Sequence, residues 1–521
     1  MFLFRMLITL LLTVNTASLF SQSRWVMQYY EDEDAVGKYV SESYDKGYFL
    51  VGKHGHNYSN YTWLIKTDIN GEKLWEKTFG DPTTSISLVE MDYNILGEIY
   101  LVGLTGYYNE ESYDPLIMKL NACGEKQWCR VFIEDGINYS NALVITPDGG
   151  VVILLMYMST IPYTDRICLA KFDIEGNLQW KHCYNSPDSS ISNQDAWNLT
   201  LAPNGGILIT AMCGYRDPTP PHMSRPKPYY IMTDSLGIFK WEKVVHIDVS
   251  DKGGEAWSTV LSPDSNYFYS SISHYYRSTP YGNTPALLKM DLNGNVIDIF
   301  DLAPLGDYGK MFEAKFVTDT NIMASAVWGN SAKPKAVIID TVGSIIHQTN
   351  LLDNEWMAFT EVSFDGKLLY FTNINDSNEN FDTYLFKLNQ QLESDTLYTQ
   401  LFNYDSLCTY QIVSDTIVQD NCGLIVGDRE IKEETTLTDI LHVFPNPTGD
   451  YCIIEYDLSK FDHKANIVIT DLYGRNIFSF NPENTRTQKT VSLANFPAGV
   501  YFFTLSINNS LKESHKLIIT K

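Results

Sequence analysis

The sequence predicts an all-β protein in which a seven-bladed β-propeller is followed by a small β-sandwich. A hairpin turn with Asp or Asn first and Gly three residues later occurs six times along the chain. A second turn signal, such as Pro147 to Gly150, precedes an apolar run upstream of most of these hairpins, so each repeat holds about four strands. Four-stranded units that repeat roughly every 40 to 50 residues are typical of a β-propeller, because one such sheet cannot bury both of its faces alone. We expect the propeller over residues 22–400, with eight blades as the alternative.

The residue types at the two ends of the repeated turn each have a chemical reason. The first side chain can accept a hydrogen bond from the backbone two residues on, and the glycine supplies a positive φ at little steric cost. In four repeats a tryptophan follows the glycine by four residues, and we expect its ring to fill the gap between neighbouring blades. A seventh copy opens at Asn389 and lacks the glycine. The six complete turns are Asp68, Gly71 and Trp75; Asn121, Gly124 and Trp128; Asp173, Gly176 and Trp180; Asp234, Gly237 and Trp241; Asp291 and Gly294; and Asp340 and Gly343.

The N-terminal residues 1–21 are typical of a secretory signal peptide, with Arg5 ahead of an apolar run from Met6 to Val14. That run is short for a membrane crossing, and no later segment holds about 18 continuous apolar residues. We therefore expect no transmembrane segment in the mature chain. Residues 24–30 form a lone predicted strand, and its Trp25 could complete the last blade and so close the ring. The alternative is that residues 396–402 supply the missing strand.

Residues 401–440 are expected to be a linker with a disulfide loop. Its second half is acidic and poor in apolar residues, which is typical of a linker. Cys408 and Cys422 bracket a short polar segment, while Cys168 and Cys183 are equidistant from a hairpin turn. We expect a disulfide within each of these two pairs in an oxidising compartment; buried free thiols are the alternative.

The C-terminal residues 441–521 show several short apolar strands at regular spacing, which indicates a small sandwich. Its recognisable pieces occur in a fixed order and end in a lysine-flanked strand: Pro445, Asn446 and Pro447; Asp471, Gly474 and Arg475; Gly499 and Tyr501; Lys516 and Lys521. Together they resemble the type A C-terminal sorting domain of the type IX secretion system of Bacteroidetes. The resemblance implies an immunoglobulin-like fold, the type IX secretion machinery as partner, and export through the periplasm to the medium or the outer cell surface.

The propeller hairpins are similar to those of pyrroloquinoline-quinone-type propellers, in which Asp, Gly and Trp also mark the last two strands of each blade. The spacing differs, since glycine follows Asp by three residues here. No cofactor constellation accompanies the resemblance, so only the architecture is carried over and no cofactor is expected.

Little catalytic chemistry is evident. A net charge of −25 without a basic run argues against a nucleic-acid partner. His54 and His56 lack a third ligand, and the Asp-rich turns lack the late Glu of a calcium loop, so no metal site is predicted. Residues 215–229 and 275–281 are the long loops in which a function could lie. We expect a binding module for a glycan or a protein; the alternatives are an enzyme with carboxylates in the channel and a structural surface component.

Overall fold

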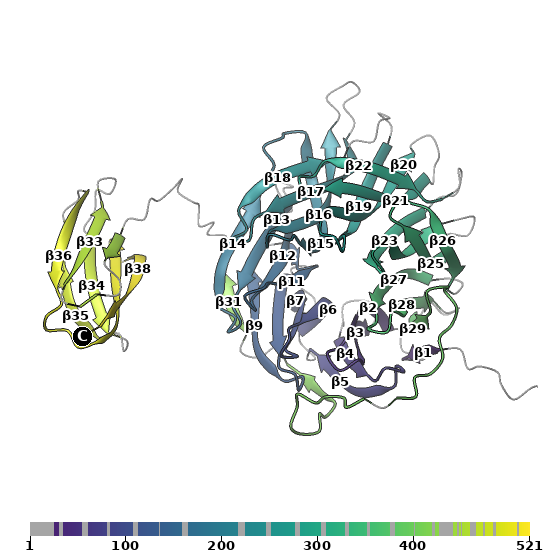
Figure 1. Cartoon of the computed structure of the whole chain (residues 1–521), viewed down its shortest axis with the longest axis horizontal. Coiled ribbons are helices and arrows are strands. Elements are labelled where there is room, and N and C mark those ends of the chain that lie inside the picture. The colour runs from purple at the N-terminus through teal and green to yellow at the C-terminus, as the bar shows by residue number, and fades with distance from the viewer. Residues whose placement is uncertain are drawn as a thin grey trace, which may run out of the picture. The chain divides into compact units, whose positions relative to one another are not determined.

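The computed structural model (Figure 1) describes the chain with gaps. The described residues are 25–30, 35–54, 61–80, 84–107, 113–134, 136–158, 165–216, 224–245, 252–276, 282–303, 309–328, 333–351, 355–375, 381–400, 402–418, 422–426, 441–444, 448–449, 451–458, 465–471, 475–482, 486–507 and 510–520. They divide into two compact units at residues 428 and 429. All regular elements among them are β-strands.

The first unit is a ring of antiparallel sheets, and the described residues contain seven of them (Figure 1). We number the sheets one to seven along the chain, starting with the sheet that contains β2 and ending with the sheet that contains β27 and also β1. In that order, their strands are β2 (Ala35–Glu42), β3 (Tyr48–His54), β4 (Tyr61–Thr67) and β5 (Lys73–Phe79); β6 (Thr84–Tyr93), β7 (Ile99–Tyr107), β8 (Asp114–Leu120) and β9 (Lys126–Ile133); β10 (Ile137–Tyr139), β11 (Leu143–Ile145), β12 (Val151–Met158), β13 (Asp165–Phe172) and β14 (Leu178–Tyr184); β15 (Ile191–Leu201), β16 (Ile207–Arg216), β17 (Ser224–Thr233) and β18 (Phe239–Val244); β19 (Lys252–Leu261), β20 (Tyr267–Tyr276), β21 (Gly282–Asp291) and β22 (Val296–Asp301); β23 (Gly309–Phe316), β24 (Asn321–Trp328), β25 (Lys333–Asp340) and β26 (Ile345–Asn350); and β27 (Glu355–Val362), β28 (Leu368–Asn375), β29 (Phe381–Leu388) and β1 (Val26–Tyr29).

Apolar side chains fill the spaces between neighbouring sheets. Phe49 and Leu64 of sheet one share a buried cluster with Leu101 and Met118 of sheet two. The middle strands of each sheet are apolar on both faces, as in β12, where seven of eight residues are buried. Burial on both faces requires a neighbour on each side, which a ring of sheets supplies.

The predicted turns adopt the expected conformation. Asp68 Oδ1 accepts hydrogen bonds from the backbone N–H groups of Asn70 and Glu72, both at 2.8 Å. Gly71 has a φ of 81°. In the seventh copy, Leu392 occupies the glycine position with a φ of 61°, so the turn survives the loss of its glycine.

Each tryptophan of the repeat packs on the turn glycine of the next sheet. The distance from the tryptophan ring to a Cβ atom placed on that glycine measures how closely the two residues pack. Such an atom would lie 3.4 Å from the Trp75 ring at Gly124 and 2.5 Å from the Trp128 ring at Gly176. The corresponding distances are 2.6 Å for Trp180 at Gly237 and 2.8 Å for Trp241 at Gly294. Where the tryptophan is missing, Phe300 takes its place beside Gly343.

Sheet seven contains strands from both ends of the part of the chain that forms the ring. β1 pairs antiparallel with β29, with Met27 opposite Leu385. Trp25 shares a buried cluster with Tyr48 of sheet one, so the last sheet packs on the first. The strand predicted at residues 24–30 therefore completes the last sheet, whereas residues 396–400, the alternative, form no strand.

The linker predicted for residues 401–440 is wrong for its first half. Residues 402–418 and 422–426, which we call the C-terminal strap, belong to the first unit. Within the strap, β30 (Asp415–Ile417) pairs in parallel with β5 and β31 (Gly423–Val426) pairs in parallel with β9. The strap is ordered because its backbone satisfies the open outer edges of sheets one and two.

The disulfide predicted between Cys408 and Cys422 is also wrong. Cys408 is bonded to Cys123 and Cys422 to Cys129, so each half of the strap is covalently attached to sheet two. Proximity in the sequence suggested the wrong partners, because parallel pairing with distant strands determines which thiols meet. Cys168 is bonded to Cys183, directly opposite it across β13 and β14.

The second unit consists of two sheets around one core. One sheet contains β32 (Leu441–Phe444), β33 (Tyr451–Asp457) and β36 (Arg486–Ser492); the other contains β35 (Asn476–Phe480), β34 (Ala465–Asp471), β37 (Gly499–Ile507) and β38 (Ser510–Ile519). Ile454 from the first sheet and Ile467 and Phe503 from the second are fully buried in the shared cluster.

Candidate functional site

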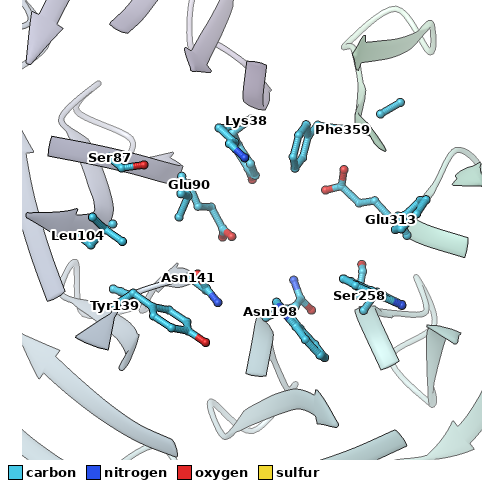
Figure 2. A pocket seen from close by; sticks show the side chains of 18 residues that line it. Lys38, Ser87, Glu90, Leu104, Tyr139, Asn141, Asn198, Ser258, Glu313 and Phe359 are labelled. Atoms are coloured by element: carbon cyan, nitrogen blue, oxygen red, sulfur yellow. The ribbon is translucent and has the colours of Figure 1, made fainter. Parts of the chain in front are cut away.

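The first strands of the sheets surround the centre of the ring, and a cavity of about 440 Å³ lies between them (Figure 2). This volume is within the range of about 300–1,000 Å³ that small-molecule sites occupy. Strands from all seven sheets contribute to its wall: Lys38 and Tyr39; Ser87, Val89, Glu90, Gly103 and Leu104; Tyr139, Ser140 and Asn141; Trp197 and Asn198; Trp257 and Ser258; Phe312 and Glu313; and Ala358 and Phe359.

Aromatic rings form one side of the cavity. Trp197 of β15 and Trp257 of β19 are stacked, with ring centroids 4.8 Å apart and an interplanar angle of 24°. Phe312 of β23 meets Trp257 edge-on at 5.5 Å. All three rings are half-buried, so they offer faces and edges to a ligand in the cavity.

Two amides accompany the aromatic rings. The Asn198 side-chain oxygen accepts a hydrogen bond from the backbone N–H of Thr259 at 3.0 Å, and the Asn141 amide nitrogen donates to the Ala196 carbonyl at 3.1 Å. Within the described residues, the Asn198 nitrogen and the Asn141 oxygen have no protein partner. These two amides thus offer the cavity a free donor and a free acceptor in positions that the backbone already fixes.

Two carboxyl groups face the cavity from opposite sides, Glu90 from β6 and Glu313 from β23 (Figure 2). Burial raises the pKa of Glu90 well above its usual range, and burial also raises the pKa of Glu313. Each accepts a backbone hydrogen bond, from Leu143 N–H at 3.4 Å and from Thr360 N–H at 2.6 Å respectively. A carboxyl group that keeps its proton can donate a hydrogen bond to a ligand oxygen.

Lys38 of β2 lies across the cavity from Asn198 and Ser258, which directly follow Trp197 and Trp257 in the sequence (Figure 2). Sheet one accordingly lies across the ring from sheets four and five (Figure 1). Among the described residues, its ammonium group has no hydrogen-bond or ion-pair partner. Burial, and then the nearby charge of Lys53, lowers the pKa of Lys38 to about 8. It is therefore an unpaired, partly desolvated cation that is still charged at neutral pH.

A charged layer lies two residues further along the same strands. Because alternate residues of a strand share a face, Asp92 follows Glu90 and Lys315 follows Glu313 toward the ring axis. Lys315 Nζ lies 2.8 Å from Glu361 Oε2 of β27. Burial alone disfavours the Lys315 ammonium, but the carboxylates of Glu361 and Glu313 outweigh burial and raise its pKa. Burial raises the pKa of Asp92 to about 6.

The residues predicted from the repeat do not line this cavity. The turn residues, from Asp68 and Gly71 to Asp340 and Gly343, connect the outer strands of their sheets, and the tryptophans from Trp75 to Trp241 pack between sheets. Their role is architectural. The long loops expected at residues 215–229 and 275–281 are shorter than predicted. β16 ends at Arg216 and β17 begins at Ser224, while β20 extends to Tyr276. His56 and residues 1–21 lie outside the described residues.

No cavity-lining residue was singled out from the sequence. The signal that could have found them is a pair of charged residues at i and i+2 in the first strand of a repeat, as in Glu90 and Asp92 or Glu313 and Lys315. The part of the chain that the structure describes holds no group of three His, Cys, Asp or Glu side chains placed to bind a metal ion. It also holds no helix long and apolar enough to cross a membrane.

Comparison with known families concerns the second unit. Residues 442–520 match the family model described as the secretion system C-terminal sorting domain. This unit is a sorting domain of the type IX secretion system. The chain is therefore a substrate of that system, exported to the cell surface or the extracellular space, and the secretion machinery is its partner.

The structure describes five of the ten sorting-motif residues predicted from the sequence. Arg475 lies 2.6 Å from Asp471 in an ion pair, and its N–H donates to the same carboxylate at 3.0 Å. Tyr501 Oη donates to the Pro497 carbonyl at 3.0 Å, close to where β37 begins at Gly499. Lys516 lies exposed on β38. The remaining residues lie outside the described part of the chain: Pro445, Asn446, Pro447, Gly474 and Lys521.

Solved structures similar to the chain are distant in sequence. A protein of unknown function from Dyadobacter fermentans is 13% identical, with a TM-score of 0.42, over 70% of this chain and 98% of its own. The polysaccharide lyase Uly1 is 12% identical, with a TM-score of 0.46, over 69% of this chain and 91% of its own. No curated protein matches the chain in sequence.

Proposed function

We propose that the exported protein is a seven-bladed β-propeller that binds a saccharide in its central cavity, with an immunoglobulin-like C-terminal sorting domain as its address. The seven described sheets, and the completion of the seventh by β1, support the blade number. Two sheets around one core support the immunoglobulin-like fold of residues 441–521.

The observation that carries the saccharide proposal is the stacked pair Trp197 and Trp257 beside free amide groups in the cavity. The C–H faces of sugar rings are apolar and fit flat aromatic surfaces, while their hydroxyl groups need both donors and acceptors. Asn198 and Asn141 supply one of each. Burial raises the pKa of both Glu90 and Glu313, and each adds a further donor without adding charge when it holds its proton.

A second candidate function is hydrolysis of a glycan, because Glu90 and Glu313 face each other across the cavity. Glycoside hydrolases use one protonated and one ionised carboxyl group on opposite sides of the scissile bond. Here burial raises both pKa values, whereas this mechanism uses two carboxyl groups whose surroundings shift their pKa values apart. We therefore favour binding over turnover.

The proposal is tested by titrating the secreted protein with neutral and acidic oligosaccharides in a calorimeter while reducing ends are assayed. We expect binding without release of reducing ends, and loss of binding in Trp257→Ala. Trp241→Ala is the matched control, because Trp241 packs between sheets beside Gly294 and is no part of the cavity wall. Reducing-end release that disappears in Glu90→Gln or Glu313→Gln would favour the enzyme instead, and equal loss of binding in both tryptophan variants would contradict a cavity site.

A further inference from the structure

The charges of the central cavity are unevenly distributed. Lys38 projects from the wall formed by β2, and within the described residues no carboxylate pairs with it (Figure 2). Glu361 pairs instead with Lys315, one layer deeper, and Glu313 acts on Lys315 through its charge. A buried or partly buried ammonium group without a partner is unfavourable, and such groups are normally paired.

Lys53 strengthens the positive character of this wall. It lies on β3 opposite Val36 of β2, and its charge acts on Lys38. The other ionisable groups that line the cavity are Glu90, Glu313, Tyr39 and Tyr139, and burial raises the pKa of all four. Burial therefore favours the neutral form of each of these four groups, which weakens their repulsion of an anionic ligand.

We propose that the cavity selects an anionic saccharide, with the stacked Trp197 and Trp257 holding a sugar ring and Lys38 pairing with a carboxylate or sulfate group on the saccharide. This inference rests on the proposed function and adds the ligand class to it. Lys38 is on the wall opposite the tryptophans, so a ligand that spans the cavity contacts both. Burial favours the protonated form of Glu90 and Glu313, and a protonated carboxyl group donates a hydrogen bond to an anionic ligand instead of repelling it.

The decisive comparison uses ligands that differ only in charge. A galacturonic acid trimer is titrated into the full-length secreted protein beside its fully methyl-esterified counterpart, and a sulfated galactose oligomer is titrated beside its unsulfated form. We expect at least one acidic probe to bind about 10-fold more tightly than its neutral counterpart, as charge-assisted hydrogen bonds provide. Which acidic probe binds distinguishes a carboxylate from a sulfate ligand.

Substitutions of Lys38 test whether this residue causes the preference for the acidic probe. Lys38→Met is expected to remove the preference for the acidic probe, so that the ratio of the two dissociation constants falls close to one, and Lys38→Arg is expected to restore it. Lys240→Met is the matched control, since Lys240 lies on the outer strand β18 and pairs with Asp234 at 2.7 Å. Thermal unfolding of each variant checks that the fold is retained.

The pH dependence provides a readout that loss of packing would not reproduce. The affinity of the wild type for the acidic probe should fall as pH rises through about 8, because Lys38 then loses its charge, whereas Lys38→Arg should bind equally at pH 7 and pH 9.5. Equal affinity for acidic and neutral probes would overturn the anionic class and leave the saccharide proposal intact. Failure of every saccharide to bind would overturn both.

Discussion

Trp25 packs on Gly71 as Trp75 packs on Gly124: a Cβ atom on Gly71 would lie 3.0 Å from Trp25 Cη2, and one on Gly124 would lie 3.4 Å from Trp75 Cη2. The first tryptophan after the expected signal peptide therefore occupies the position that the repeat assigns to the last strand of a blade. Only a sheet built from both ends of the propeller sequence places it there. Because this contact depends on Trp25, a single substitution can test whether the ring closes.

Truncating Trp25 should destabilise the ring. Trp25 is 2% exposed, and Trp25→Ala should lower the free energy of unfolding by about 3 to 5 kcal/mol, as for other large-to-small core changes. Gln28→Ala, on the exposed side of the same strand, is the control and should change it by less than about 0.5 kcal/mol. Urea denaturation followed by tryptophan fluorescence measures both. Equal midpoints for the two variants would mean that β1 does not close the ring.

Two turn glycines separate backbone strain from the contact between sheets. Gly176 has a φ of 79° and Gly149 a φ of 82°, so alanine at either costs about 1 to 2 kcal/mol of backbone strain. At Gly176 the new Cβ would also lie 2.5 Å from Trp128, whereas at Gly149 it would meet nothing within 4 Å. Overpacking adds about 1 to 3 kcal/mol. Gly176→Ala should therefore unfold at a clearly lower urea concentration than Gly149→Ala, and the reverse order would contradict the stacking of tryptophan on glycine.

The two disulfides of the strap should not contribute additively to stability. Each closes a loop of nearly the whole ring, with sequence separations of 285 and 293 residues. Once either bond is present, the other closes only a ring of about 20 residues. The chain-entropy model therefore gives a loss of about 3 kcal/mol for removing either bond and about 9 kcal/mol for removing both. Cys→Ala pairs at Cys123 with Cys408 and at Cys129 with Cys422, alone and combined, test this by urea denaturation.

The disulfide between Cys168 and Cys183 provides the control for that experiment. It lies within sheet three and spans only 15 of the 285 residues in the Cys123–Cys408 loop, so its removal should add almost independently to either strap variant. Strict additivity between the two strap bonds would show that they do not close a common loop.

Asp195 should make the protein less stable as the pH rises. Burial raises its pKa to about 6, against about 4 in an unfolded chain. Between these values the folded state holds a proton that the unfolded chain has released, so stability falls as pH rises through this window and stays lower above it. Asp195→Asn keeps an acceptor for Tyr139 Oη, which donates to Asp195 at 2.9 Å, and should gain stability relative to the wild type from pH 4 to 7.

Asp173 is the opposite case and serves as the control. Burial opposes its ionisation, but hydrogen bonds from Asn177 outweigh burial and lower its pKa. Its ionised form therefore stabilises the fold above the unfolded pKa, and this contribution is lost as pH falls. Asp173→Asn should be less stable than the wild type at pH 7, with the difference closing at low pH. Melting temperatures of both variants across pH 4 to 7 measure the two slopes, and equal signs would contradict the assignment.

The architecture was predictable because residues that are close together in the sequence determine each repeat. Each turn depends on an Asp or Asn and a glycine three residues apart, and the tryptophan that fixes the next sheet follows within the same hairpin. The pairing of Cys168 with Cys183 is local in the same sense. Trp25 could be assigned to the far end of the chain because it matches a repeated pattern.

The strap and the cavity were not predictable, because neither is local. Cys408 lies beside Cys123 only in the folded ring, where β30 and β31 pair in parallel with strands that precede them by more than 280 residues. The cavity wall takes two to five residues from each of seven sheets, and a lone Lys38 or Glu90 carries no pattern of its own. Such a site becomes visible only when the ring brings these strands together.

A crystal structure of the secreted protein soaked with the saccharide that binds most tightly would show directly where the saccharide binds. We expect electron density for a sugar ring against Trp197 and Trp257 within the central cavity. Density for the saccharide only on the outer surface, with the cavity filled by ordered water at saturating ligand, would contradict it.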